Sequence, residues 1–450
     1  MHIAKKNVDL FLTGKREGKA LRRRHLQGMK RDARARAAEH QALRRIVFGS
    51  DSLIAEMLSR SPSVALAMPQ TSLRVPLPSK FSMFSSPAEV LRLISAFALV
   101  YRSKPISDVY VDFSKISLQD LGAHGLLDKL VDEIQTQTRF RQGKLRWSGN
   151  FPRDAAQKRF VRAMGIIRQL GLKKFYLPID DQAKIVLFER RCKHYLRAMR
   201  KVSPFDKTEQ ANAAEKFVDY VNGCLARENQ ALTETARAAL CSYVVEILDN
   251  AENHAGMVDW TIQGYLDTAA DTPECEIVIF NFGKSIYESM STLAPDSFMG
   301  KKIKAFLDKQ ALAGAYLNSW RKDELVTLYA LQEAVSSQRD SLKSTRGKGT
   351  ADLIEFFQRM SDERQLVERG GASMYIISGG TRIVFDGRYR MARDDKGVRK
   401  IAFNKENDLD KLPDPSCVMP LKDAFLPGTM IGIRFPIEAP SLVDVEEASA

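Results

Sequence analysis

The stretch from Leu240 to Gly256 reads LCSYVVEILDNAENHAG. At 3.6 residues per turn it places an apolar stripe along one side of a helix, made of Val244, Ile247, Leu248, Ala251 and Ala255. Glu246, Asn250 and His254 follow at four-residue spacing, so they project from one face. A carboxylate and a carboxamide in neighbouring turns suit magnesium-assisted phosphoryl chemistry, because Mg²⁺ prefers oxygen ligands and a carboxylate can orient an attacking water.

An E-x-x-x-N pair alone is typical of a surface helix, but three later segments change this interpretation. Glu276 to Ser285 reads EIVIFNFGKS, a strand running into a glycine turn where the backbone can approach a flat base. Thr345 to Thr350 reads TRGKGT ahead of a helix pattern, and glycines at a helix start free backbone N–H groups for phosphates. Pro427 to Phe435 reads PGTMIGIRF, a late strand opened by Gly-Thr.

This order resembles the GHKL (Bergerat-fold) ATPases, named for gyrase, Hsp90, histidine kinase and MutL. The resemblance covers about residues 205–440 and implies an α/β sandwich that binds ATP and Mg²⁺. Glu246 to Ala251 is similar to the family's asparagine box, and looks closest to that of the type II topoisomerase B subunit. The first glycine box, the second glycine box and the late-strand threonine correspond to Asn281-Phe282-Gly283, Gly347-Lys348-Gly349 and Gly428-Thr429.

For the base, the resemblance implies that Asn281 faces the adenine amino group and that Gly283 lets the backbone approach the ring. Thr429 would support the hydrogen bonds on this side. The family usually has Asp where Asn281 stands. An Asn carbonyl can still accept from the amine, but its amide can also donate, which puts base selectivity in doubt.

For the phosphates, the resemblance implies that Gly347 and Gly349 hold them, that Asn250 ligates Mg²⁺ and that Glu246 is the general base for water. Arg346 and Lys348 either add charge at the phosphates or are solvated loop cations. Residues 286–345 take the place of the ATP lid, with helices expected around 301–317 and 322–337.

The segment before this region has an αβ rhythm. Val109 to Phe113 and Lys144 to Ser148 indicate strands, while Leu118 to Gln135 and Asp154 to Leu170 indicate helices. About residues 105–180 resemble a STAS domain, the fold of anti-sigma-factor antagonists; an unrelated small αβ domain remains the alternative. The family's phosphorylatable hydroxyl falls near the loop Leu118 to Gly122, which has none here.

The expected organisation is therefore α/β: a basic helical arm (1–45), a STAS-like domain (46–180), a helical connector (181–204), the ATP-binding domain (205–440) and a tail (441–450). The arm carries fourteen Lys or Arg and four Asp or Glu, against a net charge of +14 for all 450 residues. Clustered cations on a helix can neutralise nucleic-acid phosphates. A solvated tail is the alternative.

Composition excludes several classes. No run of about 18 apolar residues indicates a transmembrane helix, and the N-terminus has no secretory signal. None of the five cysteines forms a C-x-x-C pair, which argues against a zinc site or a disulfide framework and favours a reducing cytoplasm.

We therefore expect an ATP-binding conformational switch and slow ATPase, coupled to a STAS-like region that senses a signal or binds a protein partner. The resemblance to the GHKL family also implies that the chain could form a homodimer. The alternatives are a serine/threonine kinase of the anti-sigma type, and a nucleic-acid-associated defence or maintenance factor in which ATP gates the basic arm. A histidine kinase is disfavoured because His124 lacks the following acidic residue and the later proline of a phosphoacceptor box.

Overall fold

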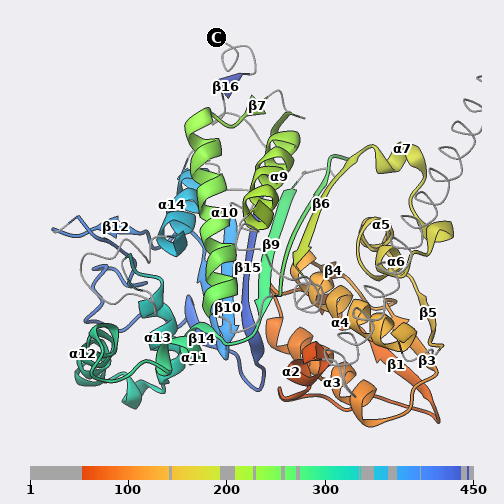
Figure 1. The fold of residues 1–450 in the computed structure, drawn as a ribbon, viewed down its shortest axis with the longest axis horizontal. Coiled ribbons are helices and arrows are strands. Elements are labelled where there is room, and N and C mark those ends of the chain that lie inside the picture. The colour runs from red at the N-terminus through yellow and green to blue at the C-terminus, as the bar shows by residue number, and fades with distance from the viewer. Residues whose placement is uncertain are drawn as a thin grey trace, which may run out of the picture. The chain divides into compact units, whose positions relative to one another are not determined.

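The fold is known from a computed structural model (Figure 1). The described residues all belong to one compact unit, Asp51–His194 together with Val202–Ala450. The predicted basic arm lies outside them, as does the tail apart from two residues. The described ranges are 53–140, 144–192, 208–226, 230–254, 259–269, 274–333, 335, 349–362, 372–395, 397–436 and 443–444.

A seven-stranded sheet is the largest element of this unit. Its order is β14-β11-β10-β15-β9-β8-β6, and all neighbours are antiparallel. Continuous apolar runs in the inner strands are typical of strands buried on both faces. The strands are β6 (Ile185–Cys192), β8 (Trp260–Asp267), β9 (Glu274–Phe282), β10 (Ser373–Gly379), β11 (Thr381–Phe385), β14 (Val418–Pro420) and β15 (Leu426–Pro436).

The two faces of this sheet contribute to different hydrophobic clusters. Ile277 and Ile279 of β9 pack with side chains from α9 (Thr208–Leu225), α10 (Glu234–His254) and α14 (Gly349–Asp362). We call this side the helix face (Figure 1). Val278 and Phe280 point to the opposite face, as the two-residue period of a strand requires.

An N-terminal layer, residues 53–182, packs on the opposite face. Its three-stranded sheet has the order β1-β3-β5 and is parallel throughout. Parallel strands need long crossover connections, which α3 and α4 provide. The layer comprises α2 (Leu53–Ser59), β1 (Ser72–Pro76), β2 (Lys80–Phe81), α3 (Pro87–Ser103), β3 (Asp108–Asp112), β4 (Leu118–Gln119), α4 (Leu121–Phe140), β5 (Arg146–Asn150), α5 (Ala155–Ala163), α6 (Ile166–Gln169), η1 (Lys173–Phe175) and α7 (Ile179–Gln182).

Polar contacts join this layer to the sheet as well. Glu276 of β9 accepts a 2.7 Å hydrogen bond from the backbone N–H of Leu121, the first residue of α4. Arg434 of β15 approaches the same carboxylate at 3.3 Å. Lys129 of α4 pairs with Asp259 at 2.7 Å, with both side chains 1% exposed. Buried charges are tolerated when they are paired, so these contacts hold α4 in one position on the sheet.

The predicted lid region contains helices, as expected from its sequence. α11 (Ile286–Ser291), α12 (Phe298–Leu312), η3 (Tyr316–Asn318) and α13 (Lys322–Ala330) surround a small cluster that includes Met290, Met299 and Val326. Ser285 and Glu288 form a capping box that starts α11 directly after the glycine turn.

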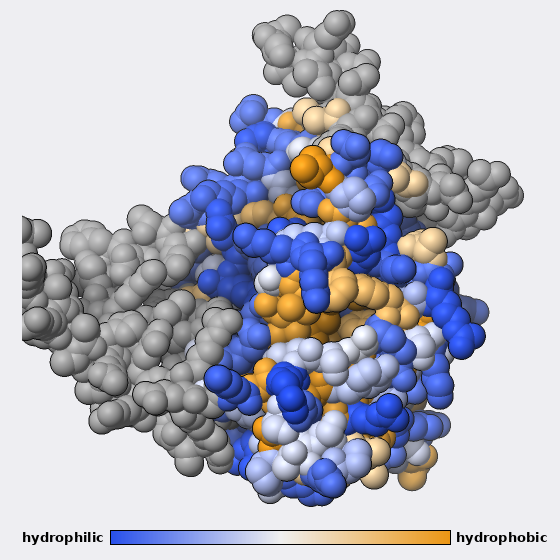
Figure 2. Space-filling model, turned by 90° about the vertical axis from the view of Figure 1, so that its right-hand side faces the viewer, coloured by the Kyte–Doolittle hydropathy of each residue, from blue (hydrophilic) through white to orange (hydrophobic). Residues whose placement is uncertain are grey.

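The remaining described strands are short pairs, and they complete the fold. They are β2 with β4, β7 (Gln230–Ala231) with β16 (Val443–Asp444), and β12 (Ala392–Arg393) with β13 (Arg399–Lys400). Figure 2 shows the side of the molecule that is on the right in Figure 1, where apolar residues gather among hydrophilic ones. Helix α7 lies on that side in Figure 1, and its first residue, Ile179, has a relative accessibility of 83%.

The predicted helical connector at 181–204 is wrong at residues 185–192, and residues 193–204 lie outside the described part of the chain. Residues 185–192 form β6, which pairs along all eight positions with β8. Arg190 and Arg191 gave the segment a charged, connector-like composition. The apolar run Ile185 to Phe188, which precedes these arginines, instead forms part of the edge strand. Phe188 contacts Phe217 and Tyr220 of α9.

The predicted α/β class is confirmed in its coarse form, a mixed α/β fold whose two larger sheets are one parallel and one antiparallel. The apolar stripe of α10 is also confirmed for its four described members, since Val244, Ile247, Leu248 and Ala251 are all buried. Among the described helices, none is long and apolar enough to cross a membrane.

Candidate functional site

Two predicted base-contacting residues are direct neighbours in the sheet. Asn281 of β9 and Thr429 of β15 are register partners, and Trp260 of β8 pairs with Asn281 on its other side. Asn281 lies two positions after Ile279, and Thr429 two before Ile431, so both belong to the helix face. The sheet therefore brings together residues that are 148 positions apart in the sequence.

The Asn281 side chain is largely enclosed, but its carboxamide is not sealed from solvent. The residue is 9% exposed, and no hydrogen bond joins its side chain to any part of the chain that the structure describes. A carboxamide at this position is therefore suited to hydrogen-bond a ligand that enters between the sheet and the helices.

Glycines allow β9 and β15 to come together at this end. Gly283 has φ 132° and Gly428 has φ 138°, a conformation that side chains rarely allow. A Cβ atom on Gly428 would lie 2.0 Å from the carbonyl oxygen of Asn281. The Gly283 N–H donates to the carbonyl of Pro427 at 3.1 Å, which closes the turn over the end of β15.

The two predicted catalytic and metal-binding residues lie on α10. Glu246 and Asn250 are within its span, although their side chains lie outside what the structure describes. α10 packs against α14 and β8, so its backbone is beside the strand that pairs with Asn281. Within the described residues, no group of three or more His, Cys, Asp or Glu could hold a metal ion.

The predicted phosphate loop is described only at its end. Arg346, Gly347 and Lys348 lie outside the described residues, and Gly349 is the first residue of α14.

The start of α14 has an anchor that sequence reasoning missed. Arg399, with 8% of its side chain exposed, pairs with Glu355 at 2.8 Å and with Asp352, both on α14, and with Glu333 at 3.1 Å. The guanidinium thereby ties the first turns of α14 to the segment after α13. No signal in the sequence marks Arg399, because its partners are 44 to 66 positions away.

Ser378 of β10 is a second missed residue. It is 1% exposed and pairs in register with Thr429. Its Oγ lies 2.8 Å from Thr429 Oγ1 and accepts a 2.8 Å hydrogen bond from the backbone N–H of Ile286, where α11 begins. Ser378 thus connects Thr429 to the predicted lid region.

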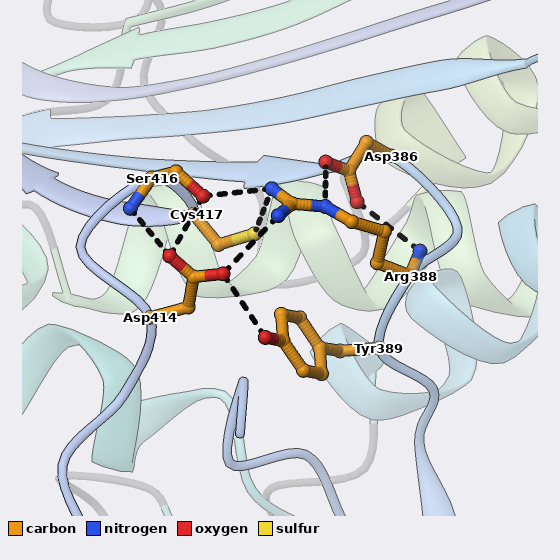
Figure 3. A network of polar contacts seen from close by, with 6 residues as sticks. All are labelled: Asp386, Arg388, Tyr389, Asp414, Ser416 and Cys417. Atoms are coloured by element: carbon orange, nitrogen blue, oxygen red, sulfur yellow. Dashed lines mark hydrogen bonds and ion pairs between the residues drawn. The ribbon is translucent and has the colours of Figure 1, made fainter. Parts of the chain in front are cut away.

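A polar network around Arg388 is structural (Figure 3). The guanidinium donates to Asp386 (2.6 Å), Asp414 (3.2 Å), Ser416 (2.8 Å) and the Cys417 sulfur (3.2 Å). Asp414 also accepts from Tyr389 at 3.0 Å. Burial raises the pKa of the Cys417 thiol to about 11, so it stays protonated at neutral pH. The network holds the loops that flank β11 and β14.

His124 is also structural. It is 1% exposed, its Nε2 lies 2.8 Å from Gln119 Oε1, and burial lowers the pKa of its imidazole to about 3. A neutral, enclosed ring agrees with the sequence-based argument against a phosphoacceptor histidine.

Comparison with known proteins found no matching family, no matching curated protein and no matching solved structure.

Proposed function

We propose that this chain is an ATP-binding conformational switch that hydrolyses ATP slowly, with the nucleotide held between the helix face of the sheet and helices α10 and α14. The observation that carries the proposal is the pairing of Asn281 with Thr429 on this face, with no hydrogen bond from the Asn281 carboxamide to the described part of the chain. At the same strand ends, Gly283 and Gly428 adopt backbone conformations that residues with side chains rarely reach.

On this proposal the base lies at the β9–β15 end and the phosphates lie toward α14. Asn281 and Thr429 contact the adenine edge, and Gly283 permits close approach of the backbone. The phosphates are held by the residues leading into α14, namely Arg346, Gly347, Lys348 and Gly349. A helix N-terminus favours anions because its free N–H groups and its dipole both point toward them.

Asn250 is the proposed Mg²⁺ ligand, and Glu246 the base that orients water. The donor set fits the metal, since a carboxamide oxygen on a helix can take one position while phosphates and waters fill the others. Bound Mg²⁺ supplies charge neutralisation at the phosphates.

The architecture supports a Bergerat-type sandwich for the seven-stranded sheet with α9, α10 and α14, and a STAS-like fold for the N-terminal layer. This layer is the proposed sensing or partner-binding part. The loop at Leu118 to Gly122 is mostly enclosed: Gln119 is 7% exposed, and Asp120 and Leu121 are 0% exposed. A kinase reaction on this loop within the same chain is disfavoured, since the loop carries no hydroxyl and is buried.

Two variants on α10 test the proposal in the full chain. Glu246→Ala should leave ATP bound and slow turnover by roughly 10²-fold or more, the scale of a lost general base. Asn250→Ala should weaken Mg²⁺-dependent nucleotide binding itself. Calorimetry with ATP and Mg²⁺ measures binding, and release of labelled phosphate measures turnover.

The same assay separates the alternatives. Transfer of label to Ser or Thr of an added protein, without free phosphate, would replace the ATPase by a kinase. Absence of ATP binding by the wild-type chain would refute the proposal.

A further inference from the structure

Ser378 makes three contacts through one hydroxyl group. Its Oγ accepts from the Ile286 N–H at 2.8 Å, donates to the Gly428 carbonyl at 3.1 Å and lies 2.8 Å from Thr429 Oγ1. The register between β10 and β15 shifts after Ser378, so Gly428 has no residue of β10 directly opposite it. The serine hydroxyl fills this gap in the ladder.

The number of protons on the two hydroxyl groups determines which one donates in each contact. A hydroxyl has one proton to donate and two lone pairs to accept with. The Ile286 N–H occupies one lone pair of Ser378, and the Gly428 carbonyl receives its only proton. The contact with Thr429 can then be a hydrogen bond only if Thr429 donates its own proton to the second lone pair of Ser378. All three contacts are satisfied together in this arrangement.

A consequence follows for Thr429, which is only half-buried. With its proton directed at Ser378, its oxygen presents only lone pairs to a ligand. Asn281 cannot discriminate in the same way, because its carboxamide can rotate to offer either an acceptor or a donor.

We propose that Ser378 is a positioning residue that sets base specificity: it fixes Thr429 as a hydrogen-bond acceptor, so that the site selects a purine with a 6-amino group over one with a 6-oxo group. This inference rests on the proposed function. It explains how the site can distinguish a 6-amino from a 6-oxo purine although Asn281 stands where the GHKL ATPases usually have Asp. Because the Ile286 N–H also bonds to Ser378, the position of the Ser378 hydroxyl depends on the start of α11.

The test compares ATP with inosine triphosphate, which carries a carbonyl where ATP has the amino group. Binding of each to the full chain is measured by calorimetry. Wild type should prefer ATP by roughly five- to tenfold, the value of one net hydrogen bond. Ser378→Ala frees the Thr429 hydroxyl to rotate, so the preference should fall to within about twofold.

Thr381→Val is the matched control. Thr381 pairs with Ser378 in the next strand and is 0% exposed, and its Oγ1 has no hydrogen-bond partner in the described chain. Removing this hydroxyl should leave the preference for ATP unchanged. Thr429→Val should abolish the preference, and adding Ser378→Ala to it should cause no further loss. If Ser378→Ala does not fold, Thr429→Val supplies the decisive measurement.

The outcomes separate the two proposals. If wild type binds neither nucleotide, the proposed function fails. If it binds ATP and inosine triphosphate equally, or if Ser378→Ala or Thr429→Val keeps the full preference, ATP binding stands and the role of Ser378 is overturned.

Discussion

Gly428 combines a φ of 138° with a Cβ position only 2.0 Å from the Asn281 carbonyl oxygen. Gly428→Ala must therefore push β15 away from β9 at the point where Asn281 and Thr429 meet. We expect a loss of stability of about 1–3 kcal/mol, the usual cost of forced backbone strain, together with weaker ATP binding. Chemical denaturation and calorimetry measure the two effects.

Gly223→Ala is the control for this prediction. Gly223 lies in α9, and nothing beyond the helix's own backbone and its chain neighbours lies within 4 Å of the added Cβ. Alanine there should stabilise the helix by up to about 1 kcal/mol and leave binding intact. Unchanged stability and ATP affinity in Gly428→Ala would show that the strand ends do not need to be this close.

At the residue scale, local sequence patterns predicted some features and not others. The strands containing Asn281 and Thr429 were predicted from their apolar runs and glycines, and the structure confirms both strands. Their pairing could not be predicted, since register depends on contacts between distant segments. Ser378 sits in an ordinary strand sequence, and its role depends on a hydroxyl 51 positions later. The functional roles themselves stay predictions.

The first turn of α4 meets β9 through the carboxyl group of Glu276. Burial outweighs the nearby Arg434 and raises the pKa of this carboxyl from 4.5 to about 7. Between these two pH values the folded state holds a proton that the unfolded state has released. The contribution of Glu276 to stability therefore falls as pH rises from about 4.5 to about 7. Glu276→Gln should remove this slope and keep an acceptor for the Leu121 N–H.

The measurement is the free energy of unfolding at several pH values, taken as the difference between variant and wild type. Glu274→Gln is the matched control, because Glu274 lies on the same strand with a side chain that is 44% exposed. If the free energies of unfolding of Glu276→Gln and wild type change in parallel between about pH 4.5 and pH 7, the raised pKa of Glu276 is contradicted.

At the element scale, helices with a clear apolar stripe were predictable, and α10 is an example. β6 was not predictable, because its three successive charged residues, Glu189 to Arg191, are not typical of a strand. β6 lies at one edge of the sheet. Glu189 accepts from Gln263 of β8 at 3.1 Å, and Arg191 donates to Gln169 at 3.2 Å. These partners of Glu189 and Arg191 lie 22 or more positions away, so the sequence pattern does not reveal them.

At the scale of the whole molecule, the N-terminal layer and the sheet share one hydrophobic core. Phe97 and Leu127 from the layer belong to the same cluster as Val278, Phe280 and Ile377 from the sheet. A chain beginning at residue 202 would lack β6 and expose this apolar face to water. We expect it to aggregate, and co-expression with residues 51–201 to restore solubility. Size-exclusion chromatography distinguishes the outcomes, and a monomeric, cooperatively melting fragment would show that the two parts fold independently.

β9 and β15 carry Asn281 and Thr429 on one face and Glu276 and Arg434 on the other. A small displacement of either strand at the helix face would therefore reach the first turn of α4 within the same molecule. The proposed nucleotide site and the N-terminal layer belong to one chain, so they are always present in a one-to-one ratio. No encounter between separate proteins is needed. A response to nucleotide that travels by this route would follow first-order kinetics and would be insensitive to dilution.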